Sequence, residues 1–473
     1  MAQIKVRNPL NGQFDYAFEA SSVNDVRAQA QVARRAQADW FGKGLEHRIR
    51  VLKAWAESLE RHTPAIAQAL SADTGRHRIS HEEIGAIVYF IHGFCAAAPE
   101  VLAQPFKKFK NNADVVFKTT YIPYPLVGVI SPWNFPLVLS FIDAIPALVA
   151  GATVLVKPSE VTPRFVDPLL SSIAEVPELA GVINLVRGGP EVGQAVIAAS
   201  DAIVFTGSVP TGRKIALAAA EAFIPAFLEL GGKDPAVVLA GSDLSRAATS
   251  ILRSAIYNSG QVCYAIERVY VDETIHDEFV AELVKQTATL RRSLAGGDGG
   301  HYGPFIFEKQ GAIVGAQLDD AVAKGARILT GGKVETLDGA VWMDPTIVVD
   351  VNHGMTLMTE ETFGPVVPVM KFKTVAEAAA LANDTIYGLS GAVFGPDTHT
   401  AGDVATLVFA GGVSINDTEL PRGMQFDGEK TAFKMSGMGG SRYGATSMLR
   451  YVRKRALMAN EGQVKPLSVL EET

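Results

Sequence analysis

Residues 126–160 read LVGVISPWNFPLVLSFIDAIPALVAGATVLVKPSE, in which one short apolar run opens the segment and another nearly closes it. Continuous apolar runs of this length, bounded by turn residues, are typical of buried strands. We therefore expect strands at 127–130 and 153–156 with a buried helix between them. Similar runs follow at 182–186 and 202–205, with room for helices between them. This alternation predicts an α/β fold built on a doubly wound parallel sheet.

The predicted strands end in glycines and small polar residues. Open parallel sheets bind ligands beyond the carboxyl ends of their strands, and those ends carry 131–134, 157–160, 188–190 and 206–208. These segments lack the Gly-x-Gly-x-x-Gly fingerprint of dinucleotide sites. Gly189 with Gly193, and Gly207 with Gly212, could instead open helices whose N-terminal amides face phosphates. They could equally mark ordinary turns between strand and helix.

Cys263 lies in the stretch 258–264, NSGQVCY, whose composition predicts a turn. A thiol exposed on a turn can act as a nucleophile, whereas an isolated cysteine more often packs in a core, as we expect for Cys95. Two other stretches favour a nucleophile at Cys263. Glu229 precedes a glycine pair that permits close backbone approach, and Asn134 lies between two prolines that stiffen the chain around its amide.

Together these motifs resemble the aldehyde dehydrogenase superfamily. The segments 132–136 (PWNFP), 229–233 (ELGGK), 260–263 (GQVC) and 361–365 (ETFGP) occur in the order and approximate spacing of that family, and the match runs from about residue 8 to about residue 455. The resemblance implies two doubly wound α/β domains and a small β element for oligomerisation. It places the NAD-binding domain at 1–111 and 125–231, the catalytic domain at 232–445, and the oligomerisation arm at 112–124 and 446–473.

The resemblance also implies oxidation of an aldehyde to its acid with NAD, through a thiohemiacetal and a thioester. Cys263 would attack the carbonyl, Asn134 would hold the developing oxygen charge, and Glu229 would deprotonate the water that hydrolyses the thioester. Lys157 completes the expected catalytic set. At the adenosine ribose, the carboxylate of Glu160 would repel a 2′-phosphate, which favours NAD over NADP. The expected cofactor contacts are Ile130, Ser131, Pro132, Trp133, Lys157, Ser159, Glu160, Gly189, Gly193, Phe205, Thr206, Gly207, Ser208, Leu230, Gly231, Glu361 and Phe363.

The sequence near the reactive centre suggests a pocket for an aromatic or apolar aldehyde. The residues that would line it are Phe135, Leu139, Ile142, Val262 and Tyr264. A polar loop at 417–433 replaces a shorter loop usual in the family. Arg422 or Arg442 could pair with a substrate carboxylate, although solvated loop charges are commoner. An acid-semialdehyde dehydrogenase is therefore an alternative. A coenzyme A-acylating enzyme is another, which Glu229 disfavours because that branch activates no water.

Composition limits the other functions. The chain has 43 Lys and Arg against 50 Asp and Glu, a formal net charge of −7 that favours neither nucleic acid nor an anionic membrane as a partner. Two widely separated cysteines form no metal-site spacing, and the N-terminal sequence has no apolar signal segment. We expect no metal and a cytoplasmic homodimer or homotetramer. A cofactor-free cysteine hydrolase would need a histidine in these motifs, which contain none, and an idle binding protein would not need an intact set of Cys263, Glu229 and Asn134.

Overall fold

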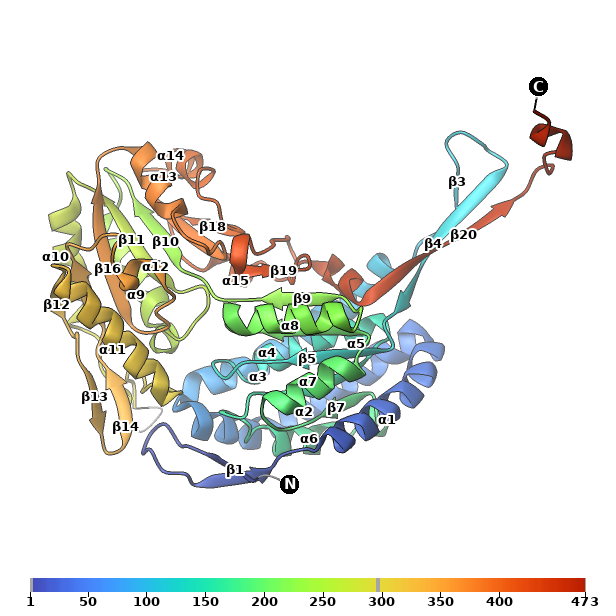
Figure 1. The fold of residues 1–473 in the computed structure, drawn as a ribbon, viewed down its shortest axis with the longest axis horizontal. Coiled ribbons are helices and arrows are strands. Elements are labelled where there is room, and N and C mark those ends of the chain that lie inside the picture. The colour runs from blue at the N-terminus through green and yellow to red at the C-terminus, as the bar shows by residue number, and fades with distance from the viewer. Residues whose placement is uncertain (1–2, 295–297, 473) are drawn as a thin grey trace.

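The computed structural model describes residues 3–294 and 298–472, and two largely parallel sheets dominate the fold (Figure 1). The first sheet has the strand order β19-β9-β8-β5-β6-β7, and β19 alone runs antiparallel to its neighbour. Its strands are β5 (Leu126–Ile130), β6 (Thr153–Lys157), β7 (Ile183–Leu185), β8 (Ala202–Thr206), β9 (Ala226–Glu229) and β19 (Gly437–Met438). The strands expected at 127–130, 153–156, 182–186 and 202–205 are thus confirmed.

Helices cover both faces of this sheet, because side chains alternate across a pleated strand. Val127 and Val129 pack on one face with α2, α3, α5 and α6, whereas Leu126 and Ile130 pack on the other with α1, α7 and α8. The helices are α1 (Val23–Gly42), α2 (Gly44–Thr74), α3 (His77–Leu102), α4 (Val138–Phe141), α5 (Ala144–Ala150), α6 (Val166–Ala174), α7 (Pro190–Ala199) and α8 (Val209–Glu221).

Helix α3 passes through the core beside α2 and α5. The buried Cys95 lies within it, and burial raises the pKa of this thiol to about 11, so the expectation that Cys95 packs in the core is confirmed. By length and composition alone α3 could cross a membrane, a weak signal because the core helices of folded proteins share it. Here Ile84, Ile87 and Phe94 pack into the main hydrophobic cluster.

The second sheet has the order β12-β15-β16-β11-β10-β17-β18, with β12 antiparallel to β15 and the other pairs parallel. Helices α9 and α10 cover one face, and α11, α13 and α14 cover the other. The α/β fold class is therefore confirmed. Its elements are β10 (Asp234–Val238), β11 (Ile266–Asp272), β12 (Arg327–Thr330), β15 (Thr346–Val349), β16 (Val366–Phe372), β17 (Ser390–Phe394), β18 (Gly412–Ile415), α9 (Leu244–Ile256), α10 (His276–Thr287), α11 (Glu308–Ala323), α12 (Thr356–Thr359), α13 (Val375–Asn383), α14 (Thr398–Ala405) and α15 (Leu420–Gly423).

A third, antiparallel sheet projects away from the two lobes at the upper right of Figure 1. In it, β20 (Val452–Asn460) pairs with β4 (Val115–Pro123) along its whole length, and β3 (Lys107–Lys108) pairs with the other edge of β4. These strands lie in or next to the segments expected to form the arm. Oligomerisation through this arm stays a prediction, as do the domain boundaries. Two hairpins complete the fold, β1 (Gln3–Val6) with β2 (Tyr16–Glu19) and β13 (Val334–Leu337) with β14 (Ala340–Met343).

Candidate active site

Cys263 follows a tight turn, as its sequence context predicts. In η2 (Tyr257–Gly260), the φ angles of residues 258, 259 and 260 are 56°, 55° and 73°. Left-handed conformations at non-glycine residues persist only where their surroundings enforce them. Here Asn258 Nδ2 donates to the backbone oxygen of Asn134 at 3.1 Å, and Ser259 Oγ donates to a second backbone oxygen at 2.8 Å. The turn thereby fixes the backbone from which the Cys263 side chain projects.

Asn134 lies just beyond the carboxyl end of β5 and is only 3% exposed. Its side-chain Nδ2 donates to the backbone oxygen of Gln261 at 3.0 Å. A primary amide has two N–H donors, so the second remains for another acceptor. Asn134 and Cys263 line the same cavity. An amide donor is therefore held rigidly beside the thiol, across two segments far apart in the sequence.

Glu229 ends β9 at the carboxyl edge of the first sheet, opposite Thr206 of β8. The two glycines that follow have no room for a side chain. A Cβ on Gly231 would lie 2.6 Å from both carboxylate oxygens of Glu361, and a Cβ on Gly232 would lie 2.3 Å from the backbone oxygen of Cys263. Glycine at these positions therefore lets three segments of the chain meet at one point.

Two cavities meet at Cys263. One has a volume of about 420 Å³ and the other about 130 Å³. Both are lined by Leu139, Thr206, Glu229, Leu230 and Cys263. The thiol and the carboxylate can therefore be reached from two sides. Of the expected cofactor contacts, the larger cavity is lined by Pro132, Trp133, Thr206, Gly207, Ser208, Leu230, Gly231, Glu361 and Phe363.

The other expected cofactor contacts lie on or just beyond the carboxyl ends of the same strands. Lys157 Nζ donates to Glu160 Oε2 at 3.0 Å, and a Cβ on Gly193 would lie 3.6 Å from Ile130 and 3.8 Å from Lys157. Gly189 caps the start of α7, and space remains around its Cα. Lys157 is not among the described residues that line either cavity, and its catalytic role stays a prediction. The remaining residues of this group are Ser131, Ser159 and Phe205, at the ends of β5, β6 and β8.

The smaller cavity contains four of the five expected substrate contacts. It is lined by Phe135, Leu139, Ile142 and Tyr264, together with Tyr257 and Tyr443. Val262 is 1% exposed and is not among the described lining residues.

Arg442 also lines the smaller cavity, and the expectation that it is a solvated loop charge is wrong. It is 7% exposed and bonds Asp143 at 2.7 Å as well as the hydroxyl of Thr206. Asp143, between α4 and α5, is buried, which opposes its ionisation, yet Arg442 and Arg450 hold the pKa of this carboxyl below its usual value. Arg442 is buried because it pairs with the buried carboxylate of Asp143. The sequence did not reveal where Asp143 lies in the fold. Arg422, by contrast, has a side chain 45% exposed.

Two more residues of the polar loop line the same cavity. Lys430 Nζ lies 5.3 Å from the ring centre of Tyr443, and Gln425 is 3% exposed, with no hydrogen-bond partner for Nε2 among the residues that the structure describes. Sequence patterns do not single out either residue. The sequence signal that pointed to this part of the pocket was the loop at 417–433, which is longer and more polar than the loop usual in the family.

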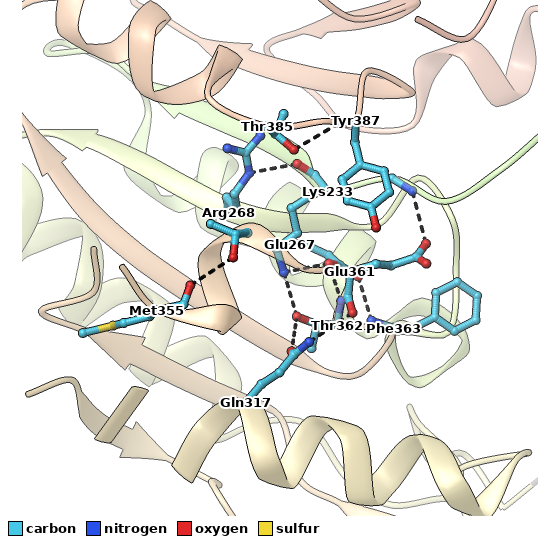
Figure 2. A network of polar contacts seen from close by, with 12 residues as sticks. Lys233, Glu267, Arg268, Gln317, Met355, Glu361, Thr362, Phe363, Thr385 and Tyr387 are labelled. Carbon is cyan, nitrogen blue, oxygen red and sulfur yellow. Dashed lines mark hydrogen bonds and ion pairs between the residues drawn. The ribbon is translucent and has the colours of Figure 1, made fainter. Parts of the chain in front are cut away.

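Burial favours the protonated forms of the Cys263 thiol and the Glu361 carboxyl. Burial raises the pKa of Cys263 to about 12, and the negative charge of Glu361 adds to the shift. Burial also raises the pKa of Glu361 to about 8, assisted by the charge of Glu267. Figure 2 shows Glu361 at the edge of a buried polar network that includes Lys233, Glu267 and Thr362. Cys263 therefore needs a base or a nearby positive charge to become a thiolate.

Comparison with known proteins agrees with this geometry. A model of the aldehyde dehydrogenase family matches residues 1–457. A putative succinate-semialdehyde dehydrogenase (NADP+) of Mycolicibacterium smegmatis is 33% identical over 444 residues, which cover 92% of this chain and 84% of the relative. The structure of a putative aldehyde dehydrogenase, PutA, from Anabaena variabilis matches with a TM-score of 0.96 and 47% identity, covering 98% of this chain and 99% of that one.

A betaine aldehyde dehydrogenase from Staphylococcus aureus, solved in complex with NAD+, matches with a TM-score of 0.91 and 30% identity, covering 98% of this chain and 93% of that one. The likeness extends over nearly the whole chain. The Cys263 thiol and the Glu229 carboxylate line both cavities, and the Asn134 amide lines the larger one. This chain belongs to the aldehyde dehydrogenase family and is an NAD(P)-dependent enzyme that oxidises aldehydes.

Proposed function

We propose that this enzyme oxidises a small aldehyde that itself carries a carboxylate, and releases the product by hydrolysis. The observation that carries the proposal is a pair of donors in the smaller cavity, Lys430 with one long hydrogen bond and Gln425 with no partner for Nε2 among the described residues. Cys263 and Glu229 line the same cavity. The name of the M. smegmatis relative, a succinate-semialdehyde dehydrogenase, supports the same substrate class.

The charged side chains that line the smaller cavity differ in the partners that they bind. Arg442 is neutralised by Asp143, and Arg422 donates to the hydroxyl of Tyr257 at 2.9 Å. Lys430 forms no ion pair with any described residue, and its Nζ donates only a long bond of 3.4 Å to a backbone oxygen. A buried donor without a partner, such as Nε2 of Gln425, costs roughly 1–3 kcal/mol. A bound carboxylate would satisfy both groups.

The apolar walls of the cavity are compatible with this substrate class, because a short methylene chain must separate the carboxylate from the aldehyde. Phe135, Leu139 and Ile142 would contact that chain. An aromatic or apolar aldehyde is the competing substrate, and it would make no use of Lys430 or Gln425. The two substrate classes therefore predict opposite effects when these donors are removed.

The larger cavity fits the cofactor. It contains the N-terminal end of α8, where Ser208 is the cap residue, and helix N-terminal amides attract phosphate. The edge-to-face pair of Trp133 and Phe363, with ring centres 5.4 Å apart, gives an aromatic wall. We propose that Glu361 holds a ribose there. When bound, NAD(P) supplies the hydride acceptor.

The residues around Cys263 would carry out the remaining chemistry. Glu229, directly or through water, takes the proton of the Cys263 thiol, whose sulfur attacks the aldehyde carbonyl. The free N–H of Asn134 and the backbone N–H of Cys263 hold the oxygen charge that develops; the loss of one such donor costs about 10²- to 10³-fold in rate. Oxidation leaves a thioester, and Glu229 releases the thiol proton to solvent. The regenerated carboxylate then deprotonates the water that hydrolyses the thioester.

The experiment compares kcat/KM for succinic semialdehyde and benzaldehyde in the wild type and in Lys430→Met and Gln425→Leu variants. A hydrogen bond to a charged group contributes roughly 1.5–3 kcal/mol, so we expect losses of about tenfold or more for the semialdehyde and little change for benzaldehyde. Lys371→Met, an exposed lysine on β16, is the matched control. Equal effects on both substrates, or a wild type that prefers benzaldehyde, would contradict the proposed substrate class.

We also propose that NAD is the preferred form of the cofactor. Glu160 is partly exposed at the carboxyl end of β6, where a carboxylate would repel a 2′-phosphate. The relatives differ, since one is named for NADP+ and another was solved with NAD+. The ratio of kcat/KM for NAD to that for NADP should exceed ten and should fall in Glu160→Gln. An unchanged ratio in that variant would remove Glu160 from the explanation.

A further inference from the structure

Glu267 lies four residues after Cys263, on β11, and is 3% exposed. Its carboxylate accepts hydrogen bonds from two successive backbone amides, Thr362 N at 2.7 Å and Phe363 N at 2.8 Å, each to a different oxygen (Figure 2). Glu267 therefore ties the strand that follows the reactive loop to the segment 361–363. Sequence comparison of motifs does not single out this residue.

The backbone conformation of the segment 361–363 needs stabilising contacts. Phe363 has a φ of 54°, a left-handed conformation that is unfavourable for a residue with a side chain. Glu361 accepts from Gly232 N at 3.1 Å, and Phe363 packs edge-on against Trp133. Both side chains line the larger cavity, and neither is among the described residues of the smaller one.

Lys233 is the counterion of Glu267. It is fully buried, and its Nζ donates to Glu267 at 2.8 Å and to the hydroxyl of Thr362 at 2.7 Å. Loss of one member of a buried ion pair leaves an uncompensated charge and is strongly destabilising. A single substitution of Glu267 could therefore fail to fold, and a variant that removes both charges is needed beside it.

We infer that Glu267 is a positioning residue for the cofactor side of the active site. It holds Glu361 and Phe363 in place relative to the loop that carries Cys263. The inference rests on the aldehyde dehydrogenase reaction and is independent of which aldehyde is the substrate. Its signature follows from the cavity linings: disturbing Glu267 should weaken use of NAD and leave aldehyde recognition intact. A residue that served only overall stability would lower the amount of active enzyme without separating the two KM values.

The experiment uses the full-length enzyme with Glu267→Gln and with the double variant Lys233→Met/Glu267→Gln. Glutamine offers one acceptor oxygen where two backbone N–H donors converge, so its NH₂ group would face a donor in both variants. Glu273→Gln, the same change at an exposed residue just after β11, is the matched control. Thermal melts and titration of the reactive thiol establish that each protein is folded and count its active sites.

We expect KM for NAD, and Kd for NAD measured by fluorescence, to rise at least tenfold in the folded double variant. KM for the aldehyde should stay within about twofold, and Glu273→Gln should match the wild type. A folded double variant whose KM for NAD stays within twofold would overturn the inference. Parallel rises in both KM values would also overturn it, because they would indicate general loosening of the site.

Discussion

The adjacent glycines at 231 and 232 offer the sharpest test of how the site is packed. Replacing Gly232 with alanine would put a Cβ 2.3 Å from the backbone oxygen of Cys263, whereas non-bonded contacts rarely fall below 3.0–3.4 Å. The two backbones must separate by about 1 Å, because neither partner can rotate away. A displacement of this size at reacting groups can cost about a hundredfold in rate. We therefore expect kcat of Gly232→Ala to fall about a hundredfold or more.

Gly231→Ala should behave differently, although its Cβ would also be too close to a neighbour, at 2.6 Å. That neighbour is the end of the Glu361 side chain, which can turn aside. The turn would break the bond from Gly232 N to Glu361, which contributes about 0.5–1.5 kcal/mol, so KM for NAD should rise roughly 2- to 10-fold while kcat changes little.

Steady-state NADH absorbance, with circular dichroism to establish folding, separates these outcomes. Gly85→Ala is the control, because Gly85 lies exposed in α3 with open space around its Cα, and alanine there should add about 0.5–1 kcal/mol of stability without changing kcat. Wild-type kcat in Gly232→Ala, or the same loss in the variants at both adjacent glycines, would refute the packing described above.

Three further predictions concern titration and helix capping. The pKa of Cys263 is about 12 against an ordinary 9.0, so alkylation of the apo enzyme by iodoacetamide at pH 7.5 should be at least a hundredfold slower than that of a free thiol. The alkylation rate should rise about tenfold per pH unit up to pH 10. A plateau of the rate near pH 8 would contradict the raised pKa. The pKa of Glu361 is raised from 4.5 to about 8, so the stability that this group contributes is fully present below pH 4.5 and is lost as the pH rises through 8. Urea unfolding of Glu361→Gln should show a stability, relative to wild type, that increases from pH 5 to pH 8.5, and a constant difference would exclude the shift. Ser22→Ala removes a capping box with Asp25 and should lower the free energy of unfolding by about 1 kcal/mol at unchanged kcat, with an unaltered urea midpoint as the contrary result.

Local patterns were sufficient to predict the main elements of the fold. The apolar runs expected at 127–130, 153–156, 182–186 and 202–205 became β5, β6, β7 and β8. Boundaries were less accurate: the run expected at 182–186 became the shorter strand Ile183–Leu185. Such errors arise because the ends of an element fray and carry little periodic signal.

The residues expected at the reactive centre occur in motifs at the ends of strands and in a turn, and their catalytic roles stay predictions. The structure brings Cys263 and Glu229 to the junction of two cavities. Lys157 bonds Glu160 at the carboxyl end of β6 and is not among the described residues that line either cavity. Its catalytic role stays a prediction.

The groups that the sequence did not reveal depend on long-range burial. Arg442 is held by Asp143, about three hundred residues earlier in the chain, and Glu267 meets Lys233 and residues 362–363 across three separate segments. Nothing in the local sequence of Gln425 indicates that its side chain is buried without a partner. Each of these features follows from tertiary packing, which a single sequence encodes only through contacts between distant positions.

In the proposed reaction, Cys263 forms a thioester, which is hydrolysed by water that Glu229 deprotonates. Rapid-mixing measurement of NADH with Glu229→Gln, NAD, an aldehyde substrate and no coenzyme A tests it most directly, with Cys263→Ala as the blank. We predict that the rate after the first turnover falls by two or more powers of ten relative to wild type, and that any NADH formed early amounts to no more than one equivalent per active thiol. Sustained turnover at the wild-type rate in Glu229→Gln would contradict the claim.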